Sequence, residues 1–221
     1  MNNNEIFPHI DHTLLRATST ASEIDSICNE ALTYNTASVC IPPSYVAYVH
    51  EKYPTLNICT VIGFPLGYST TAVKCFEAQD AIENGANEID MVIDLCFVKN
   101  GDFAAVESEI AAVKKACGDK VLKVIIETCY LTEQEKTELC GCVTRAGADF
   151  IKTSTGFGTD GARIEDIRLF RQYIGKNVRM KAAGGVKSKS DLEMFLNEGC
   201  ERIGTSSAVK LLLSGESNGG Y

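Results

Sequence analysis

The chain has 221 residues, 45% of them hydrophobic and 23% charged, which is typical of a globular protein. Its formal net charge of -8 argues against nucleic acid or an anionic membrane as a partner, although a few backbone amides and lysines can still hold one phosphate. No apolar run approaches the roughly 18 residues that span a bilayer, and the N-terminus lacks the basic and apolar parts of a secretory signal. We therefore expect a cytoplasmic protein.

Short apolar or β-branched runs alternate along the chain with stretches of helical periodicity. Their spacing matches a strand followed by a helix and two loops, the repeating unit of a parallel sheet. The predicted strands lie near residues 9–12, 37–41, 58–63, 88–93, 121–127, 149–153, 178–182 and 202–205.

The segments between the strands carry helix signals. Apolar residues recur at helical spacing in 72–84 and 103–117, and 132–146 opens with Thr132 and Glu135, a capping-box pair. Several glycines fall where a helix should end in a left-handed residue: Gly85, Gly118, Gly147, Gly175 and Gly199.

Eight such units without a linker predict an α/β protein, a single (β/α)8 TIM barrel over residues 1–213 with a flexible tail over 214–221. The alternative is a doubly wound open sheet. That fold usually carries a glycine-rich fingerprint after its first strand, which the first two loops lack.

Ten cysteines are scattered through apolar segments, and only Cys140 and Cys142 are close in sequence. Zinc sites need paired cysteine clusters or cysteines beside histidines, and His9, His12 and His50 offer no such spacing. We interpret the cysteines as small buried side chains in a reducing compartment and expect no metal.

Two lysines, Lys152 and Lys181, end the sixth and seventh predicted strands. Active sites of such barrels lie at these strand ends, and neighbouring strands are about 4.8 Å apart. Burial and a second ammonium should lower their pKa values and favour the neutral, nucleophilic amine that forms a Schiff base. Asp90 and Asp11 are inward candidates that could shuttle protons or act only as counter-ions. A structural ion pair for each lysine is the alternative.

Glycine and serine follow the last strands in a pattern that suits a phosphate. Gly156 follows the sixth strand, Gly184 and Gly185 the seventh, and Ser206 and Ser207 the eighth. Barrels often bind phosphate with these loops, where glycine lets backbone amides approach the anion. Turn glycines and an ordinary helix cap are the alternative.

At these residues the chain resembles the deoxyribose-phosphate aldolase family, class I aldolases with a (β/α)8 fold. The resemblance covers nearly the whole chain, and the stretch around Lys152 is highly specific. It rests on residues 10–13, 37–43, 61–67, 88–92, 122–128, 150–157 and 181–186.

The resemblance implies that Lys152 forms the Schiff base, Lys181 tunes its basicity and exchanges protons, and Asp90 works in the proton relay. The implied reaction is the reversible cleavage of 2-deoxy-D-ribose 5-phosphate to acetaldehyde and D-glyceraldehyde 3-phosphate. The partners are then a sugar phosphate and aldehydes, with no metal or organic cofactor, and members often form homodimers. Alternatives are another class I aldolase or transaldolase, or a non-catalytic phosphosugar-binding barrel.

The resemblance extends to residues around these three. Asp11, Lys123 and Thr155 are implied to contact the substrate or the groups that hold it, and Cys40 to lie near the site within reach of aldehydes. Tyr221, at the end of the tail, is implied to fold over the site and donate a proton, and a disordered tail tip is the alternative.

The chain departs from the family pattern at some positions. Arg179 stands where the family commonly has glycine, and should either lower the lysine pKa values or pair with a carboxylate at the barrel floor. Gly158 and Asp160 replace serine and glycine. Asp160 would repel phosphate unless it faces away or pairs with a cation such as Arg163.

Overall fold

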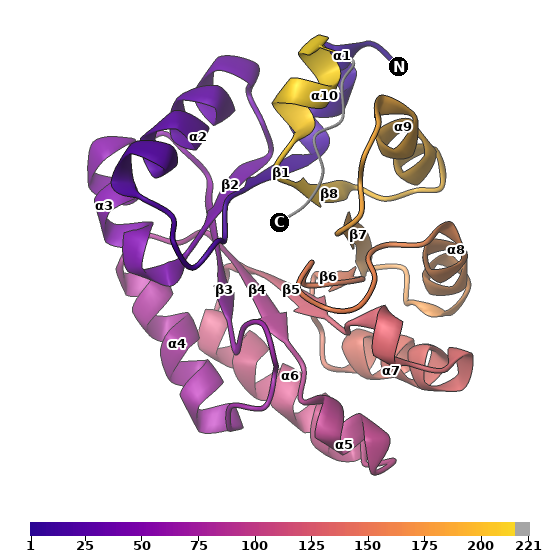
Figure 1. Cartoon of the computed structure of the whole chain (residues 1–221). Helices are drawn as coiled ribbons and strands as arrows, with labels where there is room; N and C mark the ends of the chain where they lie inside the picture. Colours follow the sequence, from indigo (N-terminus) through magenta and orange to yellow (C-terminus); the bar gives the residue numbers. More distant parts are fainter. Residues whose placement is uncertain (215–221) are drawn as a thin grey trace.

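The structure is a computed structural model that describes residues 1–214. The residues from 215 on, including Tyr221 and nearly all of the predicted tail, lie outside the described part, so the expectation for Tyr221 stays a prediction. Eight parallel strands form a closed barrel in chain order, and helices surround it (Figure 1).

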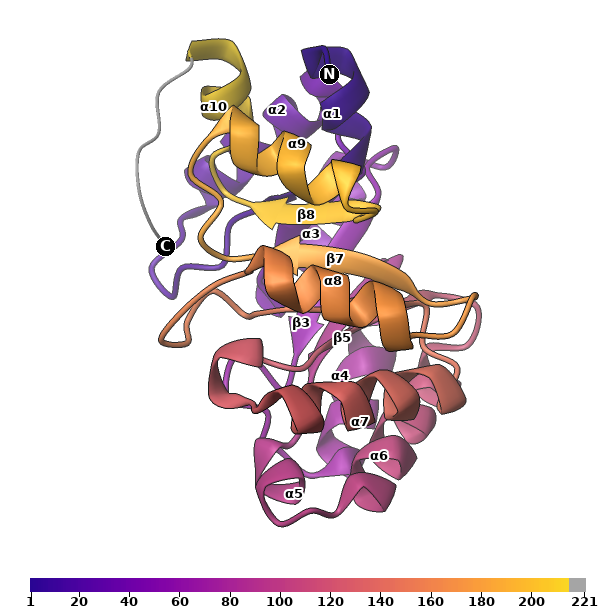
Figure 2. The ribbon, with the colours of Figure 1, turned by 90° about the vertical axis from the view of Figure 1, so that its right-hand side faces the viewer.

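All eight predicted strands are present, which confirms the (β/α)8 barrel and excludes the open sheet. Figure 2 turns the barrel on its side and shows the carboxyl ends of the last two strands, with the loops that follow them, at its left edge. The strands are β1 (Ile10–Thr13), β2 (Ser38–Ile41), β3 (Ile58–Ile62), β4 (Glu88–Val92), β5 (Val121–Ile125), β6 (Phe150–Lys152), β7 (Arg179–Ala183) and β8 (Arg202–Thr205).

The helices form the outer layer. The three helices that the sequence signals predicted are present, and their ends differ from the predicted ends by at most one residue. Thr132 caps α7 with Glu135 in the predicted capping box. The helices are α1 (Asn3–Ile6), α2 (Ala21–Tyr34), α3 (Val46–Lys52), α4 (Thr71–Glu83), α5 (Leu95–Lys99), α6 (Phe103–Cys117), α7 (Glu133–Arg145), α8 (Ile164–Tyr173), α9 (Lys189–Asn197) and α10 (Ala208–Ser214), with short 3-10 turns η1 (Phe7–His9), η2 (Pro43–Tyr45) and η3 (Thr128–Tyr130).

Four of the five predicted helix-end glycines have a positive φ, and the prediction for Gly175 was wrong. A Cβ at Gly175 would lie 2.4 Å from Thr144 Cγ2, and the Gly175 amide donates to Thr144 Oγ1 at 2.9 Å. Gly175 is therefore small because α7 approaches it closely, and its φ is not left-handed.

The hydrophobic core lies between the barrel wall and the helices. Ile89, Val124 and Ile151 point outward and are fully buried there. Strand alternation turns their neighbours, such as Asp90 and Lys123, into the barrel, where they are equally buried. The barrel interior is therefore polar while the layer around it is apolar. Within residues 1–214 we find no helix with the length and apolar character that crossing a membrane requires.

One ion pair lies within the helix layer, away from the barrel interior. Lys74 on α4 donates to Glu109 on α6 at 2.7 Å, and both side chains are almost completely buried. We expect Lys74→Met to cost about 3–5 kcal/mol of unfolding free energy, because a carboxylate then stays buried without its cation. The double variant Lys74→Met/Glu109→Leu should recover most of that loss. Urea denaturation of the two single variants, the double variant and the parent protein measures the coupling, and a double variant no more stable than Lys74→Met would contradict it.

Candidate active site

The two candidate lysines lie next to each other inside the barrel. Lys152 of β6 and Lys181 of β7 are paired in the strand register, as predicted for adjacent strands. Asp90 of β4 is paired with Lys123 of β5 in the same way. All four side chains are buried, so the barrel brings three ammonium groups around one carboxylate.

Asp90 connects these ammonium groups through both of its oxygens. Asp90 Oδ2 accepts hydrogen bonds from Lys152 Nζ and from Lys181 Nζ, each at 2.7 Å. Asp90 Oδ1 accepts from Lys123 Nζ at 2.9 Å. The ion-paired arrangement that we kept as an alternative is therefore the one in this structure. It also places one oxygen where a proton can pass between the two lysines.

The expectation that a second ammonium would lower the lysine pKa values was wrong for Lys181. Burial disfavours its charged form, but the carboxylates of Asp11 and Asp90 outweigh burial and raise the pKa of Lys181 above its ordinary value. For Asp90, burial is likewise outweighed by Lys123, Lys152 and Lys181, which hold its pKa well below the ordinary range. Lys181 is thus held as a cation by Asp11 and Asp90, the two inward carboxylates for which the sequence left open a role as proton shuttle or counter-ion.

A second set of charged side chains, linked to Asp90 through Lys181, holds Asp11 in place. Arg202, at the start of β8, donates to Asp11 Oδ1 at 2.6 Å and to Glu88 Oε2 at 2.8 Å. Asp11 also accepts from Ser38 Oγ at 2.8 Å and is ion-paired with Lys181. Sequence reasoning missed Arg202, although an arginine two residues before Gly204 on an inward strand face was a signal for it.

Arg179 does not pair with any carboxylate of the described residues, although that was one of the two roles expected for it. Its guanidinium carbon lies 4.0 Å from the centroid of the Phe150 ring, which is a cation–π contact. It forms no ion pair with the described residues, so the expected pairing with a carboxylate was wrong. The Arg179 side chain fills the space that a glycine at this position would leave, and it stacks on Phe150 of β6.

Cys40 lies inside the barrel, close to Asp90, and its neighbour on β3 is Cys59. Cys59 Sγ donates to Asp90 Oδ1 at 3.2 Å and accepts from Lys123 Nζ at 3.3 Å. Sequence reasoning missed Cys59. Its place on an inward face directly opposite Cys40 could be seen only once the strand register was known.

The loops after β7 and β8 share one cavity of about 70 Å³, as the phosphate hypothesis requires of them. Gly184 and Gly185 have φ values of 78° and 73°, a conformation that favours glycine. Ser206 and Ser207 line the same cavity, and so does Lys187, which sequence reasoning missed. The lysine directly follows Gly-Gly-Val, so its position in the loop was the available signal.

Gly156 and Thr155 do not line this cavity. A Cβ at Gly184 would lie 3.4 Å from Gly156 Cα, so Gly156 packs against the loop that follows β7. The Thr155 hydroxyl donates to Glu127, whose pKa is raised by burial. Thr155 instead lines a small apolar cavity with Phe157.

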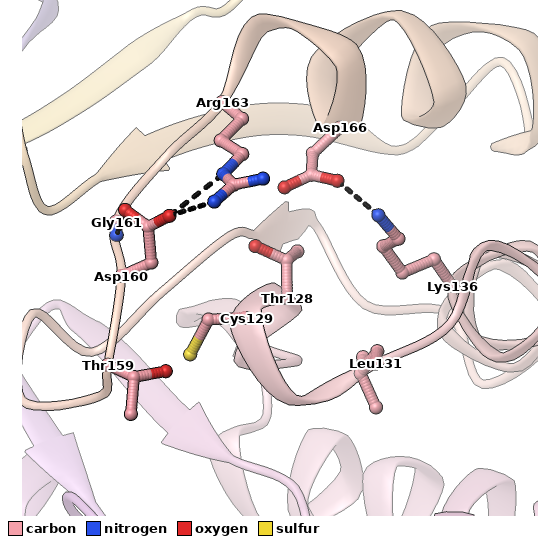
Figure 3. A pocket seen from close by; sticks show the side chains of 9 residues that line it. All are labelled: Thr128, Cys129, Leu131, Lys136, Thr159, Asp160, Gly161, Arg163 and Asp166. Atoms are coloured by element: carbon pink, nitrogen blue, oxygen red, sulfur yellow. Dashed lines mark hydrogen bonds and ion pairs between the residues drawn. The ribbon is translucent and has the colours of Figure 1, made fainter.

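Asp160 faces a separate cavity of about 310 Å³ beside α7 and α8 (Figure 3). Its carboxylate accepts from Arg163 Nε at 2.8 Å, and Lys136 pairs with Asp166 on the far wall. Asp160 is thus neutralised by Arg163, the cation that the sequence suggested for it. It does not line the cavity between the loops after β7 and β8.

Known proteins match the chain over most or all of its length. The model of the DeoC/LacD family of aldolases matches residues 6–215. A deoxyribose-phosphate aldolase of Clostridium botulinum (strain Alaska E43 / Type E3) is 59% identical over the whole of both chains. One of Clostridioides difficile (strain 630) is also 59% identical, over 94% of this chain and 95% of its own.

A solved structure agrees with these matches. The deoxyribose phosphate aldolase of Aeropyrum pernix, described as a tetramer, superposes with a TM-score of 0.89 at 33% identity, covering 96% of this chain and 92% of its own. The fold, the buried lysines and the sequence matches agree. The chain belongs to the DeoC/LacD family of aldolases.

Proposed function

We propose that this protein reversibly cleaves 2-deoxy-D-ribose 5-phosphate to acetaldehyde and D-glyceraldehyde 3-phosphate through a Schiff base on Lys152. The observation that carries the proposal is the Lys152–Asp90–Lys181 arrangement inside the barrel, on β4, β6 and β7, in which one carboxylate oxygen contacts both amines at 2.7 Å. The aldolase family of the chain and the names of its relatives support the same reaction.

In the first stage Lys152 must give up a proton before it attacks the C1 aldehyde. Asp90 Oδ2 is the acceptor in contact with Lys152 Nζ. Lys181 touches the same oxygen and remains cationic because Asp11 and Asp90 raise its pKa, so it can donate a proton to the departing carbinol oxygen. Loss of water leaves the iminium on Lys152.

In the second stage the iminium acts as the electron sink. Asp90 first passes the proton that it took from Lys152 to Lys181, which gave its own proton to the departing oxygen. Asp90 then removes the proton from the C3 hydroxyl, directly or through a water, and the C2–C3 electrons move to the nitrogen. D-glyceraldehyde 3-phosphate leaves, and the enamine on Lys152 is protonated at C2. Hydrolysis of this iminium then releases acetaldehyde and restores the amine.

The loops around Gly184 and Ser206 are the proposed phosphate site. Backbone amides at left-handed glycines, the serine hydroxyls and the Lys187 ammonium provide donors of the kind a phosphate accepts. The site lies after β7 and β8, next to the strand that carries Lys181, so it would hold the phosphate end while C1 reaches Lys152.

Lys187→Ala should raise KM for 2-deoxyribose 5-phosphate about tenfold, because one charge-assisted contact to the phosphate is lost. Turnover of unphosphorylated 2-deoxyribose should be unaffected. Steady-state kinetics with both sugars measures this split. Lys176→Ala, in the loop at the opposite end of β7, is the matched control and should change neither constant. An equal loss of kcat/KM with both sugars would show that Lys187 does not bind the phosphate.

The proposed function is tested by borohydride reduction in the presence of acetaldehyde, followed by peptide mass spectrometry. A two-carbon adduct is expected on Lys152. An adduct on another lysine, or none, would contradict the mechanism, and labelling by ketone donors in place of acetaldehyde would favour another class I aldolase.

We also propose that the protein acts as a homodimer in the cytoplasm. All ten cysteines are free thiols, which suits a reducing compartment. The Aeropyrum pernix relative, described as a tetramer, supports assembly between copies of the chain. Light scattering in solution distinguishes a dimer from a monomer or a tetramer.

A further inference from the structure

Cys40 and Cys59 lie side by side inside the barrel, next to Asp90. They are register partners on the neighbouring parallel strands β2 and β3. Neighbouring strands are about 4.8 Å apart, within the range of about 4.4–6.8 Å between Cα atoms that a disulfide spans. Both sulfurs and a carboxylate oxygen of Asp90 lie within 4.8 Å of one another. Side-chain rotation with a small backbone adjustment can therefore join the two sulfurs.

The charges around this pair decide which chemistry suits it. A divalent cation bound by both sulfurs and Asp90 would have to displace Lys123 from Asp90 Oδ1. It would then lie near the Lys152 and Lys181 ammonium groups as well. The same ammonium groups stabilise a thiolate. The neighbouring Cys59 side chain lowers the pKa of the Cys40 thiol against the effects of burial and of the Asp90 charge, whereas burial and Asp90 raise the pKa of Cys59 well above its ordinary value. The environment thus makes Cys40 the attacking thiol and disfavours a bound cation.

We propose that Cys40 and Cys59 are a peroxide-sensitive dithiol that closes into a disulfide and thereby stops the reaction at Lys152. The Cys40 thiolate attacks one oxygen of hydrogen peroxide, which forms a Cys40 sulfenic acid and releases hydroxide. Cys59 then displaces the hydroxyl group from that sulfur. The disulfide and two waters result, so the two thiols supply both electrons and both protons.

Neither cysteine lines the adjacent cavity, so peroxide reaches the pair when Leu15 or Val61 moves aside. Leu15 and Val61 pack against the two cysteines, and with Phe64 they also line a cavity of about 170 Å³. That volume exceeds the roughly 30 Å³ that one water occupies in the liquid, so a peroxide molecule fits.

Closing the bridge removes a hydrogen-bond donor from Asp90. Cys59 Sγ now donates to Asp90 Oδ1 at 3.2 Å and accepts from Lys123 Nζ at 3.3 Å. In the disulfide Cys59 has no S–H, and its sulfur turns toward β2. Asp90 Oδ1 therefore loses one of its hydrogen bonds, and the carboxylate is held less firmly. Because Asp90 Oδ2 contacts Lys152 Nζ, the amine is then no longer held in position for attack.

The bridge is identified by alkylating free thiols after peroxide treatment, digesting with trypsin without reduction, and searching for linked peptides. Cleavage at lysine and arginine places Cys40 in peptide 17–52 and Cys59 in peptide 53–74. We expect these peptides to become linked in step with the loss of aldolase activity, and dithiothreitol to reverse both changes. Cys28 shares the first peptide, so Cys28→Ser must keep the link, as must Cys96→Ser at an exposed position.

Cys40→Ser and Cys59→Ser should each abolish the link, and Cys59→Ala replaces Cys59→Ser if that variant fails to fold. A linked protein that keeps its activity, a link through Cys28, or inactivation without a link would overturn the proposal. Stopping the reaction presupposes the proposed aldolase function, whereas formation of the link does not. Borohydride trapping of the reduced protein at Lys152 therefore shows separately whether the aldolase function holds.

Discussion

Lys152→Arg should lower kcat/KM for retro-aldol cleavage by about 10,000-fold or more, the scale of loss when an enzyme loses its covalent nucleophile. Arginine keeps the positive charge beside Asp90, so the fold should tolerate the change better than it would a neutral side chain. A guanidinium stays protonated and does not form the imine. The measurement is steady-state cleavage of 2-deoxyribose 5-phosphate together with borohydride trapping.

Lys99→Arg is the matched control, because Lys99 pairs with Glu135 at the protein surface. It should leave both activity and trapping unchanged. Circular dichroism should show the same helix and strand content in both variants. If Lys152→Arg retained even a tenth of the activity, covalent catalysis at this position would be ruled out.

Asp90→Asn should affect both catalysis and stability. An amide cannot take the proton from Lys152, which should lower kcat by about 100- to 10,000-fold, the range for loss of a general acid or base. It also leaves three buried ammonium groups without their shared carboxylate, at a cost of about 3–5 kcal/mol of unfolding free energy. Kinetics below the unfolding temperature and urea denaturation measure the two effects separately.

The pH dependence of stability provides a further test of Asp90. Its pKa in the folded protein lies below the unfolded value of about 3.9, so the unfolded chain binds more protons as the pH falls through that range. Stability therefore rises with pH there, and the contribution of Asp90 is present above about pH 5 and lost in acid. Urea denaturation at several pH values should give a shallower slope for Asp90→Asn than for the parent protein. Equal slopes would show that Asp90 is not held ionised by the lysines.

The sequence by itself determined the architecture and the candidate nucleophile. Strand and helix periodicities differ, and eight alternations of them leave few alternatives to a closed barrel. Lys152 and Lys181 could be recognised because a lysine at the end of an apolar strand is unusual and because both precede glycine-rich turns. The sequence also predicted that the glycines after β7 and the serines after β8 lie together, because barrel topology places consecutive loops side by side, and they line one cavity.

Tertiary structure alone decided the charge state of the site. Whether Lys181 is neutral or cationic depends on distances to Asp11 and Asp90, which are 170 and 91 residues away in sequence. Arg179 carries the same charge as Lys181 on the same strand face, yet it stacks on Phe150 while Arg202 takes the carboxylates. Periodicity predicts which way a side chain points but not which partner it meets across the barrel. That choice follows from the strand register and from Coulomb interactions, which depend on separation in space.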